Sequence, residues 1–463
     1  MKAFASLATV VALLVLAGTA SAHPQPSSFG LGLGVGGWLD PDESKLRGLM
    51  SAKAPAWGNS PSSSARCVRG MAGEFPCDDI DMLSHLPLAS IGGGVIGNDM
   101  WGWKDRRTGR EYALVGKTNG TAFIDISDAR RPRYLGQLPT QSTTGGIFWR
   151  DIKVYKDHAF VVSENSNHGM QIFDLKRLRD VRHGTRTFTA DTVYTGISST
   201  HNLDINEDSG YAYLVGTNTC VSGGEHGGLH MVDIRNPRKP KFAGCALVEP
   251  PTDPAAPNNN YVHDSQCVNY RGPDREYRNR EICFGSNENA VVIYDVTKKS
   301  RPRVLSQTTY PTAVYTHQGW LTSDRKWFLF NDEGDEDGFG DPPTVPVQTS
   351  YILNVEDLEE TGVVRASPNN TTSIDHNLYI PGDGYVYESN YSSGLRIFTE
   401  RSVKSGDLDE VAWFDVYPED DDTHFDGGTW SNYSWFDHGV VGVSSIDRGL
   451  FLLKPRLNRS GRQ

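Results

Sequence analysis

A short aliphatic segment that ends in Asp recurs along this chain, and it constrains the fold more than any other feature. Clear copies read Ala122-Phe-Ile-Asp125, Met170-Gln-Ile-Phe-Asp174, Leu229-His-Met-Val-Asp233 and Val291-Val-Ile-Tyr-Asp295, and weaker copies end at Asn354, Thr399 and Lys454. The last residues of successive copies lie 45 to 62 positions apart. Short strands repeated at this period are typical of the blades of a β-propeller.

Proline marks a turn before the last strand of several repeats, because it cannot sit in the middle of a sheet. Pro132, Pro240 and Pro302 each follow an Asp-ended strand and precede another β-like run. We therefore expect an all-β protein with seven four-stranded blades, with Leu86–Ile91 closing the ring as the outer strand of the last blade. Six or eight blades, or an array of β-sandwiches, are the alternatives. The predicted blades are 95–139, 144–192, 196–248, 259–310, 314–366, 370–417 and 422–456.

The first 22 residues have the pattern of a secretory signal peptide: Lys2, the apolar run 7–17 and the small residues Ala20-Ser21-Ala22. An uncleaved N-terminal anchor is the alternative. Residues 23–85 are rich in Gly, Ser and Pro, which predicts a loop-rich segment, and 86–456 form the predicted propeller. The tail 457–463 is polar and has no hydrophobic anchor signal, so we expect free secretion of a monomer with no transmembrane segment after cleavage. The net charge of −12 argues against nucleic acid.

Six cysteines in a secreted chain suggest three disulfides. Fifteen pairings are possible for six cysteines, and proximity favours Cys67–Cys77, Cys220–Cys245 and Cys267–Cys283. The last two pairs are expected to join neighbouring strands of one sheet. Six N-x-S/T sequons are candidate glycosylation sites: Asn119, Asn369, Asn370, Asn390, Asn432 and Asn458.

Several longer motifs resemble the choice-of-anchor B family, and the Asp-ended units resemble LVIVD repeats. The motifs are Tyr261-Val-His-Asp-Ser-Gln-Cys-Val, Arg280-Glu-Ile-Cys-Phe-Gly-Ser-Asn-Glu288, His317-Gln-Gly-Trp-Leu-Thr, Phe330-Asn-Asp-Glu333 and Ile374-Asp-His-Asn-Leu-Tyr379. The resemblance covers about residues 86–456 and implies an exported protein. It supplies no activity. Family members carry differing surface anchors, and this chain has no recognisable one at its C-terminus.

Five histidines fall at the same place in their repeats, at or just before the first strand. They are His201, His263, His317, His376 and His424, and Asp99 and Asp151 take the matching place in the other two repeats. Equivalent positions on seven blades form a ring at one end of the central channel, and imidazoles with carboxylates are ligands for divalent metals. Asp264, Asp375 and Asp426 lie beside these histidines as further ligands or as hydrogen-bond partners of the imidazoles. The alternative is that these residues only hydrogen-bond the blades together.

A second candidate for cation binding is the acidic stretch 332–341, which is dense in carboxylates but lacks the spacing of an EF-hand. The alternative for this stretch is a solvated acidic loop. His226 and His230 share one loop and strand and are expected to be structural. Trp101, Trp103, Trp320 and Trp430 follow the ring positions and are expected to pack the channel mouth rather than to bind carbohydrate.

These patterns favour a secreted interaction module whose His- and Asp-lined channel mouth binds an extracellular ligand or protein, with a divalent metal as the candidate cofactor. The alternative is a metal-dependent extracellular hydrolase or lyase that uses the same residues. A purely structural scaffold is the third possibility. No nucleophile motif or phosphate loop is present, and no catalytic residue is assigned.

Overall fold

The computed structural model describes residues 64–144, 149–253, 255–338, 342–425 and 427–457. All of these residues belong to one compact unit, Val35–Gln463. The predicted signal peptide, most of the loop-rich segment, Asp426 and Asn458 lie outside the described residues. Within the described ranges, no helix is long and apolar enough to cross a membrane.

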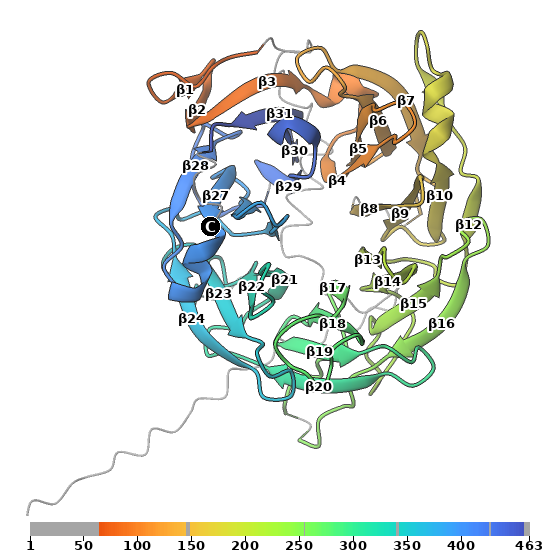
Figure 1. Cartoon of the computed structure of the whole chain (residues 1–463), viewed down its shortest axis with the longest axis vertical. Helices are drawn as coiled ribbons and strands as arrows, with labels where there is room; N and C mark the ends of the chain where they lie inside the picture. Colours follow the sequence, from red (N-terminus) through yellow and green to blue (C-terminus); the bar gives the residue numbers. More distant parts are fainter. Residues whose placement is uncertain (1–63, 145–148, 254, 339–341, 426, 458–463) are drawn as a thin grey trace, which may run out of the picture. The chain divides into compact units, whose positions relative to one another are not determined.

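Seven antiparallel sheets follow one another around a central opening (Figure 1), and we number them as blades 1 to 7 by the chain order of their inner strands. From the inner strand outward, blades 1 to 4 are β4 (Gly97–Lys104), β5 (Glu111–Lys117), β6 (Gly120–Asp125) and β7 (Arg133–Pro139); β8 (Arg150–Tyr155), β9 (His158–Ser163), β10 (Met170–Asp174) and β12 (Thr192–Tyr194); β13 (Asn202–Asn206), β14 (Tyr211–Val215), β15 (Leu229–Asp233) and β16 (Lys241–Ala246); and β17 (Asp264–Asn269), β18 (Glu281–Ser286), β19 (Val291–Asp295) and β20 (Arg303–Thr308). Blades 5 to 7 are β21 (Thr316–Leu321), β22 (Trp327–Asp332), β23 (Thr349–Asn354) and β24 (Gly362–Pro368); β25 (Asn377–Tyr379), β26 (Tyr385–Ser389), β27 (Leu395–Thr399) and β28 (Glu410–Phe414); and β29 (Thr429–Tyr433), β30 (Val441–Ser445), β31 (Gly449–Pro455) and β3 (Ile80–Leu86). The protein is therefore an all-β propeller of seven four-stranded blades, as the sequence predicts.

Shorter elements extend this framework. β11 (Arg186–Thr187) adds to the outer edge of blade 1, and β2 (Phe75–Asp78) and β1 (Met71–Ala72) add to blade 6. Four 3-10 helices lie in the connections: η1 (Leu88–Ile91), η2 (Leu175–Asp180), η3 (Glu400–Ser405) and η4 (Asp437–Gly439).

The recurring Asp has a local role at the end of the third strand of each blade. The Oδ1 atom of Asp125 accepts the backbone N–H of Ser127 at 3.1 Å, and Asp295 accepts that of Thr297 at 3.1 Å. Asn354 does the same for Glu356 at 2.8 Å. A short side-chain acceptor that captures the N–H two residues later forms an Asx turn, which reverses the chain toward the outer strand. The repeat detected in the sequence is thus a strand followed by its turn.

An apolar core fills the interface between each pair of neighbouring sheets. Between blades 1 and 2, Phe123 stacks on Phe173 with ring centroids 4.9 Å apart. Between blades 7 and 1, Met100 and Ala113 join Leu450 and Leu452 in one buried cluster. Every sheet is therefore covered on both faces by its neighbours, which accounts for the nearly continuous aliphatic runs of the third strands.

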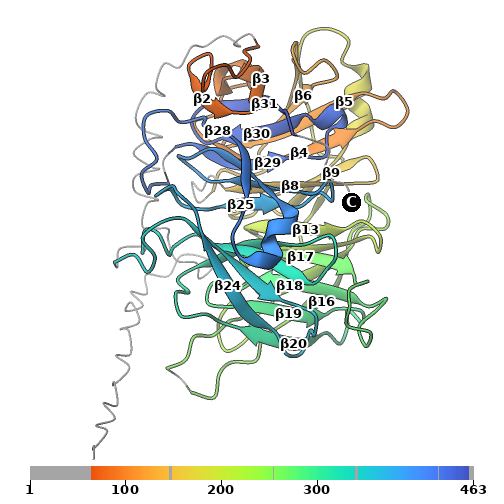
Figure 2. The ribbon, with the colours of Figure 1, turned by 60° about the vertical axis from the view of Figure 1, so that its left-hand side comes forward.

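The ring closes on an N-terminal strand, but on a different one from the predicted Leu86–Ile91. The closing strand is β3, which pairs with β31 from Ile80↔Pro455 to Leu86↔Leu450. In both views the orange β3 lies beside the blue β31 (Figure 1, Figure 2). The predicted strand was wrong because Pro87 interrupts it: Leu88–Ile91 form η1, which ends at the left-handed Gly92. Residues 71–86, assigned to the loop-rich segment, thus supply three strands of the sheets.

Three disulfides lie in the structure, Cys67–Cys77, Cys220–Cys245 and Cys267–Cys283. Cys267 and Cys283 are directly opposite each other on β17 and β18. Cys245 lies in β16, whereas Cys220 lies in the loop between β14 and β15. The second bridge therefore fastens a loop to the outer strand of blade 3 and does not join two strands, as had been expected.

Candidate functional site

Four of the five predicted ring histidines come together where the inner strands begin. His201, His263 and His376 immediately precede β13, β17 and β25, and His317 is the second residue of β21. Their rings follow one another from blade 3 to blade 6, with centroid separations of 4.3 Å (His201–His263), 4.2 Å (His263–His317) and 4.4 Å (His317–His376). We name these four residues the histidine cluster.

Hydrogen bonds fix the tautomer of three of these imidazoles. The Nδ1 atoms of His263 and His376 lie 2.9 Å and 2.7 Å from the carbonyl oxygens of His317 and Trp430. The Nδ1 atom of His201 lies 2.5 Å from Oε1 of Glu164. Carbonyl and carboxylate oxygens only accept, so in each ring Nδ1 carries the hydrogen. In a neutral ring this leaves Nε2 as a lone pair, which is the arrangement found in metal-ligating histidines.

Glu333, in the loop after β22, brings a carboxylate to the histidine cluster. Its Oε2 lies 3.4 Å from Nε2 of His317 and its Oε1 lies 3.5 Å from Nε2 of His376. The hydroxyl of Tyr391 donates to Oε1 at 2.5 Å. One donor atom each of His263, His317 and Glu333 lie within 4.8 Å of one another. Glu333 was not selected from the sequence, although it ends the quoted motif Phe330-Asn-Asp-Glu333.

Burial keeps the inner histidines neutral. His263 and His317 are buried, and removal from water, together with the neighbouring imidazoles, lowers their pKa values well below the usual range. Burial lowers the pKa of His376 to about 3. His201 lies at the more open end: burial opposes its charge, but the charge of Glu164 and its hydrogen bond raise the pKa above the ordinary value. The side chains of His201 and Glu164 are 12% and 24% exposed, so solvent reaches the cluster from this side.

Aromatic side chains from opposite parts of the ring pack beside the histidine cluster. Trp149, just before β8, stacks on Trp430 of β29 with centroids 4.7 Å apart. The ring of His376 packs against Trp430 at 4.7 Å and against Tyr391 at 4.6 Å. These contacts hold the imidazole orientations from the side away from Glu333.

His424, the fifth predicted ring histidine, does not join the cluster. Its Nε2 lies 2.9 Å from Oδ1 of Asp420 in the loop before β29. The position in blade 7 that corresponds to His317 is occupied by Trp430, because both residues form the β-bulge of their inner strands. The prediction was wrong here because the loop before β29 is longer than in the other blades. Asp426 lies outside the described residues.

Asp99 and Asp151, the predicted acidic members of the ring, also lie apart from the histidine cluster and bind the inner strands of neighbouring blades. Oδ2 of Asp151 accepts the N–H of Leu203 in blade 3 at 2.7 Å, and Oδ2 of Asp99 lies 3.4 Å from the N–H of Ile152 in blade 2. Lys153 is their cationic partner, with Nζ 2.5 Å from Asp151 and 3.5 Å from Asp99. Burial raises the pKa of Asp99, whereas Lys153 holds the pKa of Asp151 below its usual range against the effect of burial.

Asp264 belongs to this same carboxylate layer. Burial raises its pKa to about 7, and the charge of Lys153 opposes that rise. The sequence alignment of the repeats was offset by one residue here, because Asp99 and Asp151 correspond to Asp264 rather than to His263. Successive residues of a strand point to opposite faces, so an offset of one separates the Asp and His side chains.

The acidic stretch after β22 is not a solvated loop over its described part. The carboxylate of Asp332 accepts the N–H groups of Val314, Tyr315 and Gly334 and the hydroxyl of Tyr310. Asp335, Glu336 and Asp375 are buried, and donor oxygens of the three lie within 4.8 Å of one another. Asp375 therefore faces this carboxylate group rather than the histidines.

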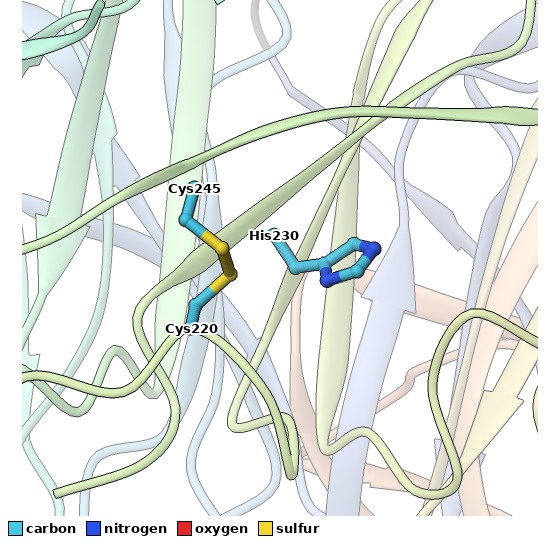
Figure 3. A group of neighbouring side chains, drawn as sticks. All are labelled: Cys220, His230 and Cys245. Atoms are coloured by element: carbon cyan, nitrogen blue, oxygen red, sulfur yellow. A yellow bond between two sulfur atoms is a disulfide. The ribbon is translucent and has the colours of Figure 1, made fainter. Parts of the chain in front are cut away.

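A third group of potential ligands, Cys220, His230 and Cys245, has a structural role (Figure 3). The two sulfur atoms are joined in a disulfide, so neither is the thiolate that binds metals. The Nδ1 and Nε2 atoms of His230 hydrogen-bond to the hydroxyls of Thr219 at 2.8 Å and Tyr194 at 2.9 Å. His226 also has a structural bond, from Nδ1 to the carbonyl of Asn218 at 3.1 Å.

Two sequons are buried, contrary to the prediction that all six lie at the surface. Asn390 accepts the N–H of His376 at 3.2 Å and donates to Glu388 at 3.1 Å, and Asn432 donates to Ser389 at 3.0 Å. A glycan on either amide would have to displace these bonds inside the ring. Asn370 is exposed, and Asn119 and Asn369 are half-buried.

The predicted tryptophans fall in three places. Trp430 lies beside the histidine cluster, and Trp103 is buried in the core between blades 1 and 2. Trp101 and Trp320 lie further along the inner strands and meet around Tyr379, with centroids 5.9 Å and 5.2 Å from it. The expectation of aromatic packing around the channel therefore holds for Trp101, Trp320 and Trp430 and fails for Trp103.

Comparison with known proteins gives no name for this chain. No protein-family model matches it, and neither does any curated protein. Among solved structures, it is similar to the β-propeller domain of Myceliophteria thermophila Cps50 (Swd1), with 9% sequence identity and a TM-score of 0.47, over 78% of this chain and 98% of that one. It is also similar to the WD40 β-propeller domain of Doa1, with 10% identity and a TM-score of 0.48, over 78% of this chain and 95% of that one. The assignment of the propeller depends on the seven sheets themselves.

Proposed function

We propose that this protein is an extracellular β-propeller that binds a divalent transition-metal ion through His263, His317, His376 and Glu333, and that presents this site to a ligand or partner protein. Imidazole nitrogens with one carboxylate suit Zn, Mn, Fe, Ni or Cu. Three disulfides and the signal-peptide pattern support an extracellular location, as does the resemblance to the choice-of-anchor B family.

The observation that carries the proposal is the meeting of two acceptors at His376 and Glu333. Nδ1 of His376 carries the hydrogen because it faces the carbonyl of Trp430. With the ring neutral, its Nε2 lone pair therefore faces Oε1 of Glu333 at 3.5 Å, where no hydrogen of its own can bridge them. A buried lone pair and a buried carboxylate repel each other unless a positive centre lies between them, and a metal ion satisfies both at once.

The arrangement also favours a site that can exchange its ligand. The inner histidines and Glu333 form one side, whereas His201 and Glu164 lie at the more exposed end. A metal held from the inner side would keep coordination positions toward His201, and an open position is what distinguishes a binding or catalytic site from a closed structural one.

Elemental analysis of the purified secreted protein tests the proposal, with His263→Ala plus His376→Ala as the test variant and His424→Ala as the matched control. We expect one stoichiometric transition metal in the parent and in the His424→Ala variant, and loss of most of it in the double variant. Absence of any stoichiometric transition metal from the parent after reconstitution would reject the proposal. Equal metal content in all three proteins would place the metal elsewhere.

A metal-dependent hydrolase or lyase is the second candidate, and the pair Glu164–His201 is the observation that favours it. The pair lies at the open end of the cluster, and the carboxylate raises the pKa of His201, which suits a group that passes a proton to or from a metal-bound water. A panel of chromogenic esters, phosphodiesters and glycosides tests this function. Activity that is lost in His201→Gln, while the metal content is unchanged, would support the enzyme over the binding module.

A further inference from the structure

We infer that Asp335, Glu336 and Asp375 form a second cation site, specific for a hard divalent ion such as Ca²⁺, at the junction of blades 5 and 6. Asp335 and Glu336 lie in the connection between β22 and β23, and Asp375 lies in the connection between β24 and β25. This site is separate in chemistry from the histidine cluster, because it contains only oxygen donors. The inference does not depend on the proposed function.

Each of the three carboxylates uses one oxygen within the protein. Asp335 accepts the hydroxyl of Tyr351 at 2.5 Å through Oδ2, and Glu336 accepts the N–H of Thr349 at 2.8 Å through Oε1. Asp375 lies 3.3 Å from the hydroxyl of Ser350 through Oδ2. These bonds come from successive residues of β23, which fixes the orientation of all three side chains.

The second oxygen of each carboxylate is buried without a hydrogen-bond donor. These atoms are Oδ1 of Asp335, Oε2 of Glu336 and Oδ1 of Asp375. The three residues are 0%, 4% and 0% exposed. Among the described residues, no Lys, Arg or His forms an ion pair with any of the three. An unsatisfied buried carboxylate oxygen is costly, and three that converge require a shared positive partner.

The spacing of the donors matches a calcium ion. All three donor atoms lie within 4.8 Å of one another. Ca²⁺ binds oxygen at about 2.3–2.6 Å, so two of its ligands are separated by at most about twice that distance. Three carboxylates also supply the charge that raises affinity for Ca²⁺ in extracellular modules. Burial raises the pKa of Asp335 to about 8, and burial with mutual repulsion raises those of Glu336 and Asp375, as expected when no cation is present.

The position of this site gives it a role in the ring. Glu333 lies two residues before Asp335, and His376 directly follows Asp375, so both segments that hold the carboxylates also carry residues of the neighbouring cluster. A cation between Asp335, Glu336 and Asp375 would fasten the two segments to each other. We therefore expect it to stabilise blades 5 and 6 and to fix the spacing of Glu333 and His376.

Calcium analysis of the intact protein, combined with thermal unfolding in EDTA or excess Ca²⁺, tests the inference. We expect stoichiometric calcium in the parent after dialysis against Ca²⁺, and an apparent Tm at least about 3 °C lower in EDTA. Glu336→Gln keeps the acceptor for Thr349 and removes one charge, so it should lose the calcium and the response to EDTA while remaining folded. Asp357→Asn, on the exposed turn after β23, is the matched control and should retain both.

Terbium luminescence provides a readout in the parent alone, should the variant fail to fold. Tyr351 bonds Asp335 directly, so Tb³⁺ at the site should be sensitised by tyrosine excitation and displaced by Ca²⁺. A parent with neither calcium nor a Ca²⁺-displaceable Tb³⁺ signal would overturn the inference and would mean that the carboxyls share protons instead. Calcium retained in full by a folded Glu336→Gln variant would overturn the location. Calcium and transition metals are quantified separately, so failure here is distinct from failure at the histidines, whose double variant should still bind calcium.

Discussion

The imidazole of His376 in blade 6 donates its Nδ1 hydrogen to the backbone carbonyl of Trp430 in blade 7, over 2.7 Å. His263 in blade 4 makes the same bond to the carbonyl of His317 in blade 5, over 2.9 Å. One interaction therefore links neighbouring blades and also turns Nε2 toward the common centre. The histidines act as structural ties and as prepared ligands at once, so the two interpretations of the ring are compatible.

Asp151 should be required for stability and not for metal binding. Asp151→Ala would leave Lys153 and the N–H of Leu203 without their partner inside the ring. Removing one member of a buried ion pair costs about 3–5 kcal/mol in the free energy of unfolding. Urea unfolding checks the stability, and elemental analysis checks the metal. Loss of the transition metal from a folded Asp151→Ala variant would return Asp151 to the ligand set.

The disulfide between β17 and β18 should stabilise blade 4. It closes a segment of 16 residues, so the double variant Cys267→Ala plus Cys283→Ala should lose about 3 kcal/mol of unfolding free energy. Equilibrium unfolding of parent and variant under non-reducing conditions measures the difference. An unchanged denaturation midpoint would show that strand pairing alone holds these two strands.

His85, on the closing strand β3, should make the stability fall in acid. Its ring stacks on Phe451 at 4.1 Å, its Nε2 bonds the carbonyl of Arg448 at 2.8 Å, and burial lowers its pKa to about 4. Below the unfolded pKa of about 6.5, the unfolded chain binds a proton that the folded chain does not, so stability decreases until the folded pKa is reached. In His85→Gln this contribution is absent.

The comparison that isolates His85 is the difference in unfolding free energy between parent and variant at two pH values. From about pH 7.5 to about pH 5 the parent should lose about 2 kcal/mol more than His85→Gln. Other titrating groups contribute equally to both proteins and cancel. Parallel pH profiles for the two proteins would contradict the assignment.

Ring closure should depend on residues 80–86. A chain that begins at residue 87 leaves β31 as an unpaired edge, and exposed edges promote association. We expect it to aggregate or to lose its cooperative thermal transition, whereas a chain that begins at residue 64 should remain a soluble monomer by gel filtration. Equal behaviour of the two chains would show that β3 is dispensable.

Glycans should be absent from Asn390 and Asn432, whose amides are bonded inside the ring, and Asn370 is the most accessible sequon among the described residues. Glycopeptide mass spectrometry of the secreted protein gives the occupancy at each site. A substantial glycan at Asn432 would be incompatible with the packing of β29 beside β26.

Local patterns predicted the architecture well, because the repeating strand and its Asx turn involve residues within a few positions of one another. The same patterns placed His201, His263, His317 and His376 correctly at the starts of their strands. They failed where a single residue matters: the β-bulges of β21 and β29 and the unequal loops shift the alignment, so His424 replaced Trp430 and Asp99 was matched to histidines. Glu333 and the carboxylates of Asp335 and Glu336 were not resolved because their partners lie in other strands.

A crystal structure with anomalous diffraction collected on either side of the absorption edge of the metal found in the protein tests the central claim most directly. The account predicts one anomalous peak within bonding distance of Nε2 of His263, His317 or His376 and of the carboxylate of Glu333. An anomalous map without a peak there, from protein loaded with the metal, would contradict the claim and would leave the histidine cluster as a set of ties between blades.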